Sequence, residues 1–294
     1  MIILASPTGG GKTELCSLLD PSRFEIVSFD SRQIYKVLSI GTAKPEKAVL
    51  DQIRHHLVDI IAPDVKINAA AFVRLAEDAI EQIYERNKIP VITCGTGFYL
   101  KAFLYGMYPV PEINTDVRQR LESISREERW DLLLKVDPKT AEALNPADDY
   151  RVIRALEVYE SGGVKWSELK ENKNDGFLAK GKLEVTGIFI NRERKELYER
   201  INKRCKMMID SGILEETKEV VEQYGENAPA LNSLGYNFAL DFMKGKISME
   251  SFLEEFSQSH RNYAKKQITW FKKEAVLNSM DWKTGLEQIK NIRW

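Results

Sequence analysis

The chain has 294 residues, a formal net charge of −1, and 43% hydrophobic and 30% charged residues, a balance typical of a soluble globular protein. It has no apolar run of about 18 residues, so we expect no membrane-spanning segment. Its apolar residues begin at Met1, which leaves no room for a targeting peptide. The near-neutral charge excludes a chain coated in basic residues, although a basic face for nucleic acid remains compatible with it.

The three cysteines do not have the spacing of a disulfide framework or of a metal site. Cys16, Cys94 and Cys205 are odd in number, lie far apart and form no C-x-x-C pair. This spacing predicts neither disulfides nor a zinc site and fits a reducing cytoplasm, where we expect the protein to act.

The first thirteen residues combine a short apolar run with a glycine-rich turn. Residues 1–4 are apolar, and SPTGGGKT follows at residues 6–13, before a segment that can form a helix. A strand, a glycine-rich turn and a helix N-terminus make a phosphate-binding loop, because backbone N–H groups and the Lys12 ammonium face the anion. The Thr13 hydroxyl is suited to bind a Mg²⁺ ion that bridges phosphates. The alternative is an ordinary turn with a chance GKT. The expected phosphate-binding residues are Ser6, Pro7, Thr8, Gly9, Gly10, Gly11, Lys12 and Thr13.

Strands, turns and helices then alternate. A mostly apolar strand over residues 24–29 ends at Asp30, and residues 69–86 place apolar side chains at helical spacing. A strand over residues 89–94 leads into Gly-Thr-Gly at 95–97 and another helix. This alternation predicts an α/β fold like that of the phosphate-loop NTPases, with a parallel sheet and helices on both faces. Functional residues should gather at the carboxyl ends of its strands.

The pattern becomes wholly helical beyond residue 115. Residues 171–181 are polar and suggest a loop, and strand character returns at residues 183–190. Four further helices are expected, over residues 193–210, 214–224, 233–243 and 249–271. The expected division is a core of residues 1–112 and 182–294 and an all-helical insertion domain of residues 113–181.

Two features of the core could support catalysis. Asp30, at a strand end beside the phosphate loop, could act as a general base or a metal contact, or it could simply cap a helix. In the basic segment 192–206, Arg200 and Arg204 share a helix face and could close over phosphates. The alternative is a solvated helix with Glu–Arg pairs.

The segment over residues 259–270 interleaves basic residues with Tyr263 and Trp270. This composition fits either a helix lying along a nucleic-acid backbone or a plain amphipathic helix. The histidines lack cysteine partners and metal-ligand spacing, so we interpret His55, His56 and His260 as structural or RNA-adjacent.

Several segments, taken together and in order, resemble bacterial tRNA dimethylallyltransferases, also called isopentenyl-diphosphate:tRNA transferases. No single segment decides the resemblance, because it rests on their order and spacing. The segments are SPTGGGKT (6–13), DSRQIYK (30–36), IGTAKP (40–45), HHLVDI (55–60), GTGFYLKA (95–102), YRVIRALEVYE (150–160), LGYNFAL (234–240) and AKKQITWF (264–271).

The resemblance implies Mg²⁺-dependent transfer of a dimethylallyl group from dimethylallyl diphosphate to N6 of the adenosine 3′ of a tRNA anticodon. Lys12, the loop N–H groups, Mg²⁺ on Thr13 and an arginine, for which we favour Arg204 over Arg200, would stabilise the leaving diphosphate. Asp30 would accept the proton of the attacking amine. The target base would have to leave the anticodon stack.

The resemblance also implies contacts with the tRNA anticodon stem–loop, and we expect the protein to act as a monomer. The target nucleotide would contact Asp30, Ser31, Arg32, Gln33 and Thr96. Further tRNA contacts would come from Arg118, Tyr150, Arg151, Val152, Ile153, Arg154, Ser233, Leu234, Gly235, Tyr236, Asn237, Arg261, Lys265, Lys266 and Gln267.

Two positions depart from the pattern of the family. Ser6 and the pair Gly9–Gly10 replace its usual Gly and small non-Gly residues, so Ser6 must tolerate the backbone conformation at that point. Cys94 replaces a usual Gly and could narrow the site beside the target base.

Three other functions compete with this interpretation. A phosphate-loop kinase of small molecules or nucleotides would explain the loop but would have no use for the insertion or the basic C-terminal helix. An adenylate isopentenyltransferase that acts on free AMP would share the loop and Asp30 but would not need the segments expected to contact tRNA. A non-catalytic RNA-binding switch would not require Asp30.

Overall fold

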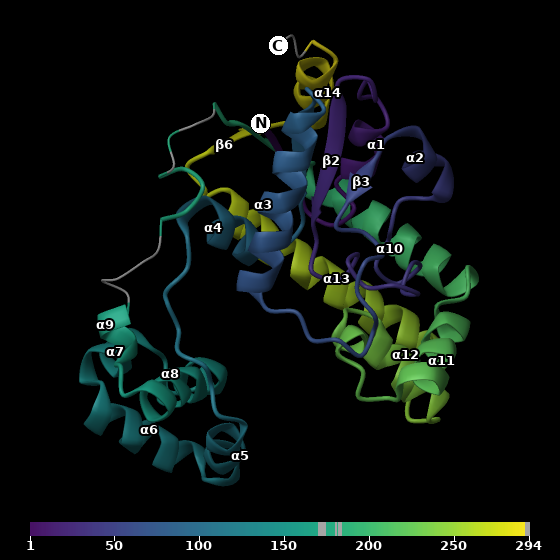
Figure 1. The fold of residues 1–294 in the computed structure, drawn as a ribbon. Coiled ribbons are helices and arrows are strands. Elements are labelled where there is room, and N and C mark those ends of the chain that lie inside the picture. Colours follow the sequence, from purple (N-terminus) through teal and green to yellow (C-terminus); the bar gives the residue numbers. More distant parts are fainter. Residues whose placement is uncertain (170–174, 180, 182–183, 292–294) are drawn as a thin grey trace. The chain divides into compact units, whose positions relative to one another are not determined.

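A computed structural model of the chain describes residues 1–169, 175–179, 181 and 184–291 (Figure 1). The chain divides into two compact units, one formed by Met1–Lys101 with Lys182–Trp294 and the other by Ala102–Gly181. The second unit thus begins eleven residues before the expected residue 113. It does so because the end of helix α4 (Gly97–Tyr105) pairs with a later segment: the N–H of Phe177 donates to the carbonyl of Phe103, at 2.9 Å.

The strands of the described residues form one six-stranded sheet in the order β3-β2-β4-β1-β5-β6, and every neighbouring pair is parallel. This confirms the predicted α/β fold class. The strands are β1 (Ile2–Ala5), β2 (Phe24–Phe29), β3 (His55–His56), β4 (Ile89–Cys94), β5 (Thr186–Ile190) and β6 (Leu277–Met280).

The register of the sheet determines where the loops meet. Ala5, the last residue of β1, pairs with Cys94, the last residue of β4. Phe29, the last residue of β2, pairs with the same Cys94. Because three neighbouring strands end level, the segments that follow them begin at one edge of the sheet.

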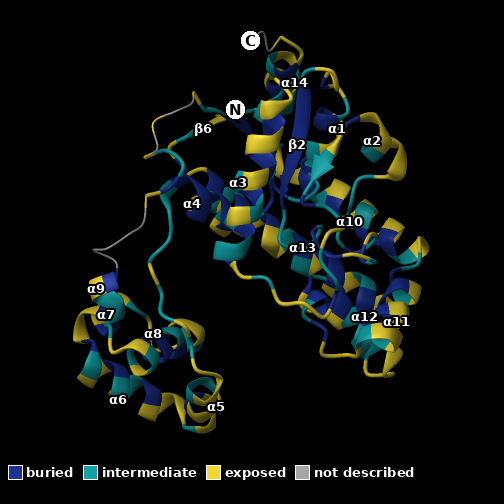
Figure 2. Cartoon of the chain, viewed as in Figure 1, coloured by how far each residue is buried: buried dark blue, intermediate teal, exposed yellow. Residues whose placement is uncertain are grey.

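Apolar side chains alternate between the two faces of the sheet, and helices cover each face. On one face, Ile2 and Leu4 of β1 join a cluster with Leu15 and Ile289. On the other, Phe29 packs against Phe72 with ring centroids 5.3 Å apart. β2 is buried along its whole length (Figure 2). The covering helices include α1 (Lys12–Cys16) and α14 (Trp282–Lys290) on the first face and α3 (Ala69–Glu85) on the second.

The C-terminal helices of the first unit follow the expected order with one difference. The helix expected over residues 233–243 begins only at Tyr236, because Gly235 directly before it has a φ of 105°, which is not helical. A short 3₁₀ turn at Pro229–Asn232 precedes it. The other helices are α10 (Arg194–Asp210), α11 (Ile213–Tyr224), α12 (Tyr236–Met243) and α13 (Met249–Phe271).

Three elements had no clear sequence signal, namely α2 (Lys47–Gln52), β6 and α14. β6 reads L-N-S-M and lies at the edge of the sheet, where a weak apolar pattern suffices. None of the described helices is long and apolar enough to cross a membrane.

The second unit is built from helices whose ends are marked by the sequence. Ser125 and Glu128 form a reciprocal capping box at the start of α6, and Asp148 caps α8. Most of the loop expected over residues 171–181 lies outside the described residues. The helices are α5 (Thr115–Ser123), α6 (Arg126–Val136), α7 (Pro138–Ala143), α8 (Asp149–Gly162) and α9 (Trp166–Leu169).

A buried carboxylate joins β2 to its neighbours. Glu25 accepts hydrogen bonds from His56 Nε2 at 2.7 Å and from the Arg86 guanidinium at 2.8 and 3.1 Å, and Lys88 lies 3.3 Å away. Burial alone would raise the pKa of Glu25, but these donors outweigh it and lower the pKa from 4.5 to about 2. The ionised carboxylate therefore stabilises the folded chain above pH 4.5, and this contribution is lost as the pH falls toward 2.

We expect Glu25→Gln to lower the free energy of unfolding at pH 7 by about 2 kcal/mol, because it removes the charge to which the Arg86 guanidinium donates its hydrogen bonds. Urea denaturation of both proteins between pH 7 and pH 3 checks this expectation. The difference between them should shrink below pH 4.5, whereas Glu81→Gln on the exposed side of α3 should change little. A difference that stays constant down to pH 3 would contradict the assignment.

Candidate functional site

The segments that follow β1, β2 and β4 enclose a cavity of about 880 Å³ within the first unit. The phosphate loop lines one side of it, and Asp30 to Gln33 and Gly95–Thr96 line another. Residues 41–43, residues 232–234 and helices α10 and α13 complete the lining. The sheet register therefore brings together the groups that the sequence placed at strand ends.

The phosphate loop leaves β1 in a tight turn. The N–H of Gly10 donates to the carbonyl of Pro7 at 2.9 Å, and Gly9 and Gly11 have φ angles of 76° and 101°, which favour glycine. Lys12 Nζ donates to the carbonyl of Ser6 at 2.7 Å. Burial lowers the pKa of Lys12, although nearby Asp30 opposes this shift.

Ser6 fits this loop because its neighbour is glycine. Ser6 is fully buried and is not among the residues with positive φ, so it is not strained. A Cβ at Gly10 would overlap the Ser6 hydroxyl, so the serine occupies space that another residue at position 10 would need. Cys94 is also fully buried and is not among the residues that line the cavity, so it does not narrow the site as expected.

Arginines of the β5–α10 segment hold the outer side of the loop. Arg192 Nε donates to the carbonyl of Gly10 at 3.0 Å, and Arg200 Nε donates to that of Gly9 at 2.9 Å. Arg200 also pairs with Glu14 at 3.2 Å. These contacts satisfy the carbonyls that point away from the cavity when the N–H groups point inward.

Arg204 differs from these two arginines. Its Nη2 donates to the Thr8 hydroxyl, but its Nε is buried without a hydrogen-bond partner among the described residues. Burial lowers the pKa of Arg204, with nearby Asp30 acting in the opposite direction. A buried, unpaired donor beside a phosphate loop is suited to bind an anion.

The C-terminal helix also contacts the loop. The Arg192 guanidinium lies 3.8 Å from the centroid of the Trp282 ring, within range of a cation–π interaction. A Cβ at Gly11 would lie 2.5 Å from the same ring, so the loop is in direct contact with α14. Nothing in the local sequence around Trp282 indicated this role.

Asp30 is held by the turn that it begins. Its Oδ1 accepts the N–H groups of Arg32 at 2.9 Å and Gln33 at 3.4 Å. A Cβ at Gly95 would lie 3.1 Å from Asp30 Oδ2, so glycine keeps that oxygen uncrowded. Thr96 accepts the N–H of Ser31 through its hydroxyl at 3.3 Å, which links the two segments.

Three residues on one face of α13 line the cavity, and their spacing at i, i+3 and i+7 is the signal that identifies this face. Gln267 accepts the N–H of Thr8 at 2.8 Å and donates to the carbonyl of Gly95 at 2.7 Å. Tyr263 donates to the same carbonyl at 3.1 Å. Burial lowers the pKa of His260 to about 3. Gln267 thus joins the phosphate loop to the β4 end. His260 and Tyr263 were noted in the sequence, but they were not assigned to the site whose cavity they line.

The residues expected to contact tRNA fall into four groups, of which the first three are as follows. Those that line the cavity are Asp30, Ser31, Arg32, Gln33, Thr96, Ser233, Leu234 and Gln267. Those with exposed side chains are Asn237, Lys265 and Lys266 in the first unit and Tyr150 and Arg151 in the second. Arg118, Arg154 and Arg261 are hydrogen-bonded or ion-paired within their own units.

The remaining expected contacts are buried, which corrects the prediction. Val152 and Ile153 belong to the core of the helical unit, because they lie on the inner face of α8. Tyr236 is fully buried and donates to Glu216 at 2.5 Å, and Gly235 packs against the ring of Phe256. These side chains support the fold and are not available to an RNA.

The oxygen donors near the loop suit a shared Mg²⁺ site better than a site made by protein alone. No group of three or more His, Cys, Asp or Glu residues gathers to hold a metal in the part of the chain that the structure describes. A small cavity of about 30 Å³ has the oxygen-bearing side chains of Thr13, Asp30, Ser28 and Thr93 in its lining, together with Lys12 and less polar residues. Mg²⁺ keeps several waters and takes one or two protein oxygens together with substrate phosphates, which these residues fit.

A parallel sheet with a phosphate loop, a carboxylate at the neighbouring strand end and an arginine-lined cavity defines the class of phosphate-loop proteins. A family model described as IPP transferase matches residues 33–274. The chain belongs to this family.

Relatives and solved structures agree with this assignment. The chain is 54% identical over 294 residues to a protein named tRNA dimethylallyltransferase from Leptospira interrogans, covering 100% of this chain and 99% of the relative. It is 46% identical to the protein of that name from Leptospira biflexa, covering 99% and 98%.

The crystal structure of the full-length tRNA isopentenylpyrophosphate transferase from Bacillus halodurans is similar, with a TM-score of 0.70, 30% identity and coverage of 99% of this chain and 94% of that one. A eukaryotic dimethylallyltransferase acting on tRNA has a TM-score of 0.81 at 26% identity, covering 96% and 73%.

Proposed function

We propose that the protein transfers the dimethylallyl group of dimethylallyl diphosphate to N6 of the adenosine 3′ of the anticodon in tRNA and releases diphosphate. The observation that supports this most is the cavity that holds both the phosphate loop and Asp30. The loop that would bind the diphosphate and the carboxylate that would accept the proton then line the same cavity. The relatives named tRNA dimethylallyltransferase support the same substrates.

The donor diphosphate would lie in the phosphate loop. The N–H groups of the loop and the Lys12 ammonium would stabilise the charge that develops on it as it leaves. Arg204 would bind it in preference to Arg200, because Arg200 is already hydrogen-bonded to the loop and paired with Glu14. The free Nε of Arg204 would gain a partner.

Mg²⁺ would be held by Thr13 with the diphosphate, and Asp30 would lie next to it. When bound, the ion would neutralise part of the charge on the leaving group. We further propose that the protein acts as a monomer. Because tRNA is the proposed acceptor, we place the reaction in the cytoplasm.

The acceptor amine is a weak nucleophile because its lone pair is delocalised into the adenine ring. As N6 attacks the allylic carbon, the bond from that carbon to the diphosphate oxygen breaks and the electron pair leaves with the diphosphate. The Asp30 carboxylate would take the proton lost by N6. The N–H groups of Arg32 and Gln33 would hold the carboxylate in place. The cavity of about 880 Å³ has room for a flipped base beside the donor.

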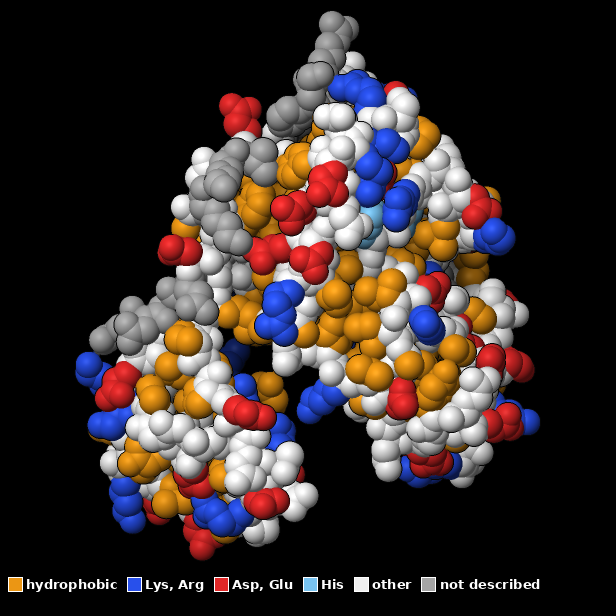
Figure 3. All heavy atoms as spheres, in the orientation of Figure 1, with side chains coloured by type: hydrophobic (Ala, Val, Ile, Leu, Met, Phe, Trp, Pro, Cys, Tyr) orange, Lys and Arg blue, Asp and Glu red, His pale blue; other side chains and the backbone are white. Residues whose placement is uncertain are grey.

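Although the net charge of the chain is only −1, its charged side chains are distributed so that one face would accept an RNA backbone. Acidic side chains, among them Asp78, Glu81 and Glu85, gather on the outer side of α3 and would repel phosphates (Figure 3). Lys265 and Lys266 are exposed on α13 and have no ion pair within the described residues. This helix also lines the cavity, so the lysines would guide an RNA backbone toward it.

The deciding experiment is incubation with labelled dimethylallyl diphosphate, Mg²⁺ and undermodified tRNA, with free AMP as a parallel acceptor. We expect label in tRNA, at the adenosine 3′ of the anticodon, and none in AMP. Label in AMP alone would favour an adenylate isopentenyltransferase. ATP-dependent phosphorylation without prenyl transfer would favour a kinase.

We expect Asp30→Asn to lower kcat by at least about 100-fold, because the amide keeps the hydrogen-bond acceptor but no longer takes a proton. Affinity for tRNA should remain within about twofold, since Asn has the same size. Single-turnover transfer and filter binding measure the two quantities separately. Normal turnover with weak tRNA binding would reassign Asp30 to binding.

We expect Lys265→Ala combined with Lys266→Ala to weaken tRNA binding and to reduce the slope of log affinity against log salt by up to about 2, one unit for each lost phosphate contact. Affinity for dimethylallyl diphosphate should not change. Fluorescence titrations at several salt concentrations measure both. An unchanged slope would show that this part of α13 does not touch phosphates.

A further inference from the structure

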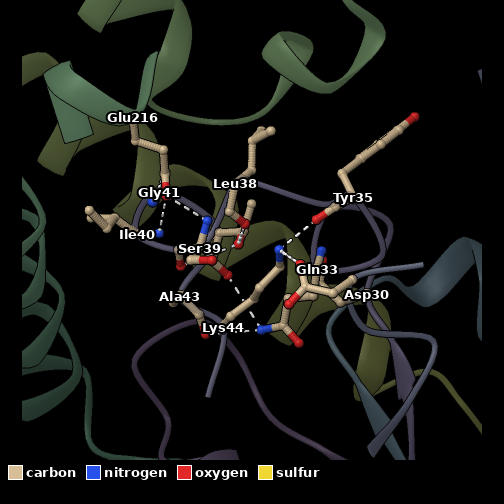
Figure 4. A network of polar contacts seen from close by, with 12 residues as sticks. Asp30, Gln33, Tyr35, Leu38, Ser39, Ile40, Gly41, Ala43, Lys44 and Glu216 are labelled. Atoms are coloured by element: carbon tan, nitrogen blue, oxygen red, sulfur yellow. Dashed lines mark hydrogen bonds and ion pairs between the residues drawn. The ribbon is translucent and has the colours of Figure 1, made fainter. Parts of the chain in front are cut away.

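A buried carboxylate holds the loop of residues 39–43, of which Gly41, Thr42 and Ala43 line the cavity. Glu216 of α11 accepts the N–H groups of Ser39 at 2.6 Å and Ile40 at 2.8 Å through Oε2. Its Oε1 accepts the N–H of Gly41 at 3.1 Å and the hydroxyl of Tyr236 at 2.5 Å. Figure 4 shows the carboxylate pointing into the turn of the backbone. We refer to this arrangement as the Glu216 clamp.

The backbone of the loop held by the Glu216 clamp adopts unfavourable φ angles on both sides of the clamp. Val37 and Ala43 have φ angles of 71° and 51°, in the left-handed region that β-branched valine strongly disfavours. Such residues persist only where the surroundings fix them. The Glu216 clamp lies between them and supplies that restraint. Tyr236 adds to it, because a Cβ at Gly41 would lie 2.5 Å from its ring.

The clamped loop reaches Asp30 through a short series of hydrogen bonds. Gly41, Thr42 and Ala43 line the cavity, and the carbonyl of Ala43 accepts Gln33 Nε2 at 3.0 Å (Figure 4). The N–H of Gln33 donates in turn to Asp30 Oδ1 at 3.4 Å. The conformation of the loop therefore helps to fix both the lining of the cavity and the orientation of the carboxylate.

We propose that Glu216 is a positioning residue for the acceptor: it fixes residues 39–43, which form the side of the cavity that the target adenosine enters. Glu216 lies in α11 and is not among the residues that line the cavity, so it would act only through the loop. This inference rests on the proposed function. We assign residues 39–43 to the acceptor because, in the proposed function, the phosphate loop holds the donor diphosphate.

Glu216→Gln tests the proposal, since it keeps the size but turns an NH₂ group toward N–H donors. We expect kcat/KM for tRNA to fall about tenfold, as for a lost hydrogen bond to a charged group. The KM for dimethylallyl diphosphate should stay within twofold. Glu215→Gln, at the exposed neighbouring position, removes the same charge and should leave both constants unchanged.

Hydrogen exchange distinguishes a local loosening of residues 39–41 from a general loss of stability. In Glu216→Gln the amides of residues 39–41 should exchange faster, while those of the phosphate loop keep their rates. Tyr236→Phe removes one of the four donors and should show the same pattern at about threefold in kcat/KM for tRNA. It keeps the proposal testable if Glu216→Gln does not fold.

Two results would overturn the proposal. One is a loss of donor affinity with unchanged tRNA kinetics, and the other is exchange that rises uniformly over the chain. If the wild-type protein prenylates no tRNA, the proposed function fails, and the exchange at residues 39–41 still decides whether Glu216 orders the loop.

Discussion

The site depends on the level ends of three neighbouring strands. Ala5 and Phe29 both pair with Cys94, so the segments after β1, β2 and β4 start from one line. A slip of one residue in a parallel pair would move a strand end by about 3.3 Å and turn its side chains to the opposite face. The interiors of these strands are apolar on both faces of the sheet, and burial of both faces opposes such a slip. Core packing within the sheet therefore sets the relation between the phosphate loop and the Asp30 carboxylate.

The conformation of the phosphate loop depends on contacts from other segments as well as on the turn of its own backbone. Its N–H groups face inward only if its carbonyls face outward, and those carbonyls need partners. Arg192 and Arg200 supply them, while Gln267 accepts the N–H of Thr8. Two of the three nearby arginines are thus used to support the loop, which leaves Arg204 as the arginine with an unpaired buried donor. In the loop of residues 39–41 the roles are reversed. There an anionic side chain, the Glu216 carboxylate, accepts hydrogen bonds from backbone N–H groups.

The parts of the molecule that the sequence predicted are those encoded locally. The phosphate loop, the strand before Asp30 and α3 each depend on residues close together in the chain, and each has its expected bounds within a few residues. The contacts between distant segments had no such signal. Neither Trp282 beside Gly11 nor Glu216 beside Gly41 could be inferred, because each joins segments separated by more than 150 residues. Motif matching also assigned Val152 and Tyr236 to the surface, since a motif does not distinguish a residue that touches a substrate from one that packs beneath it.

The contact of Trp282 with Gly11 links the phosphate loop to the order in which the chain is made. β1 is synthesised first but lies inside the sheet, where it waits for β4 and then β5 as partners. Its loop gains Arg192 still later, and it gains the Trp282 ring that packs against Gly11 after that. A nascent chain that lacks α14 therefore carries the whole phosphate-loop motif without its finished shape. During synthesis, the loop would gain its full set of contacts only after α14 has been made.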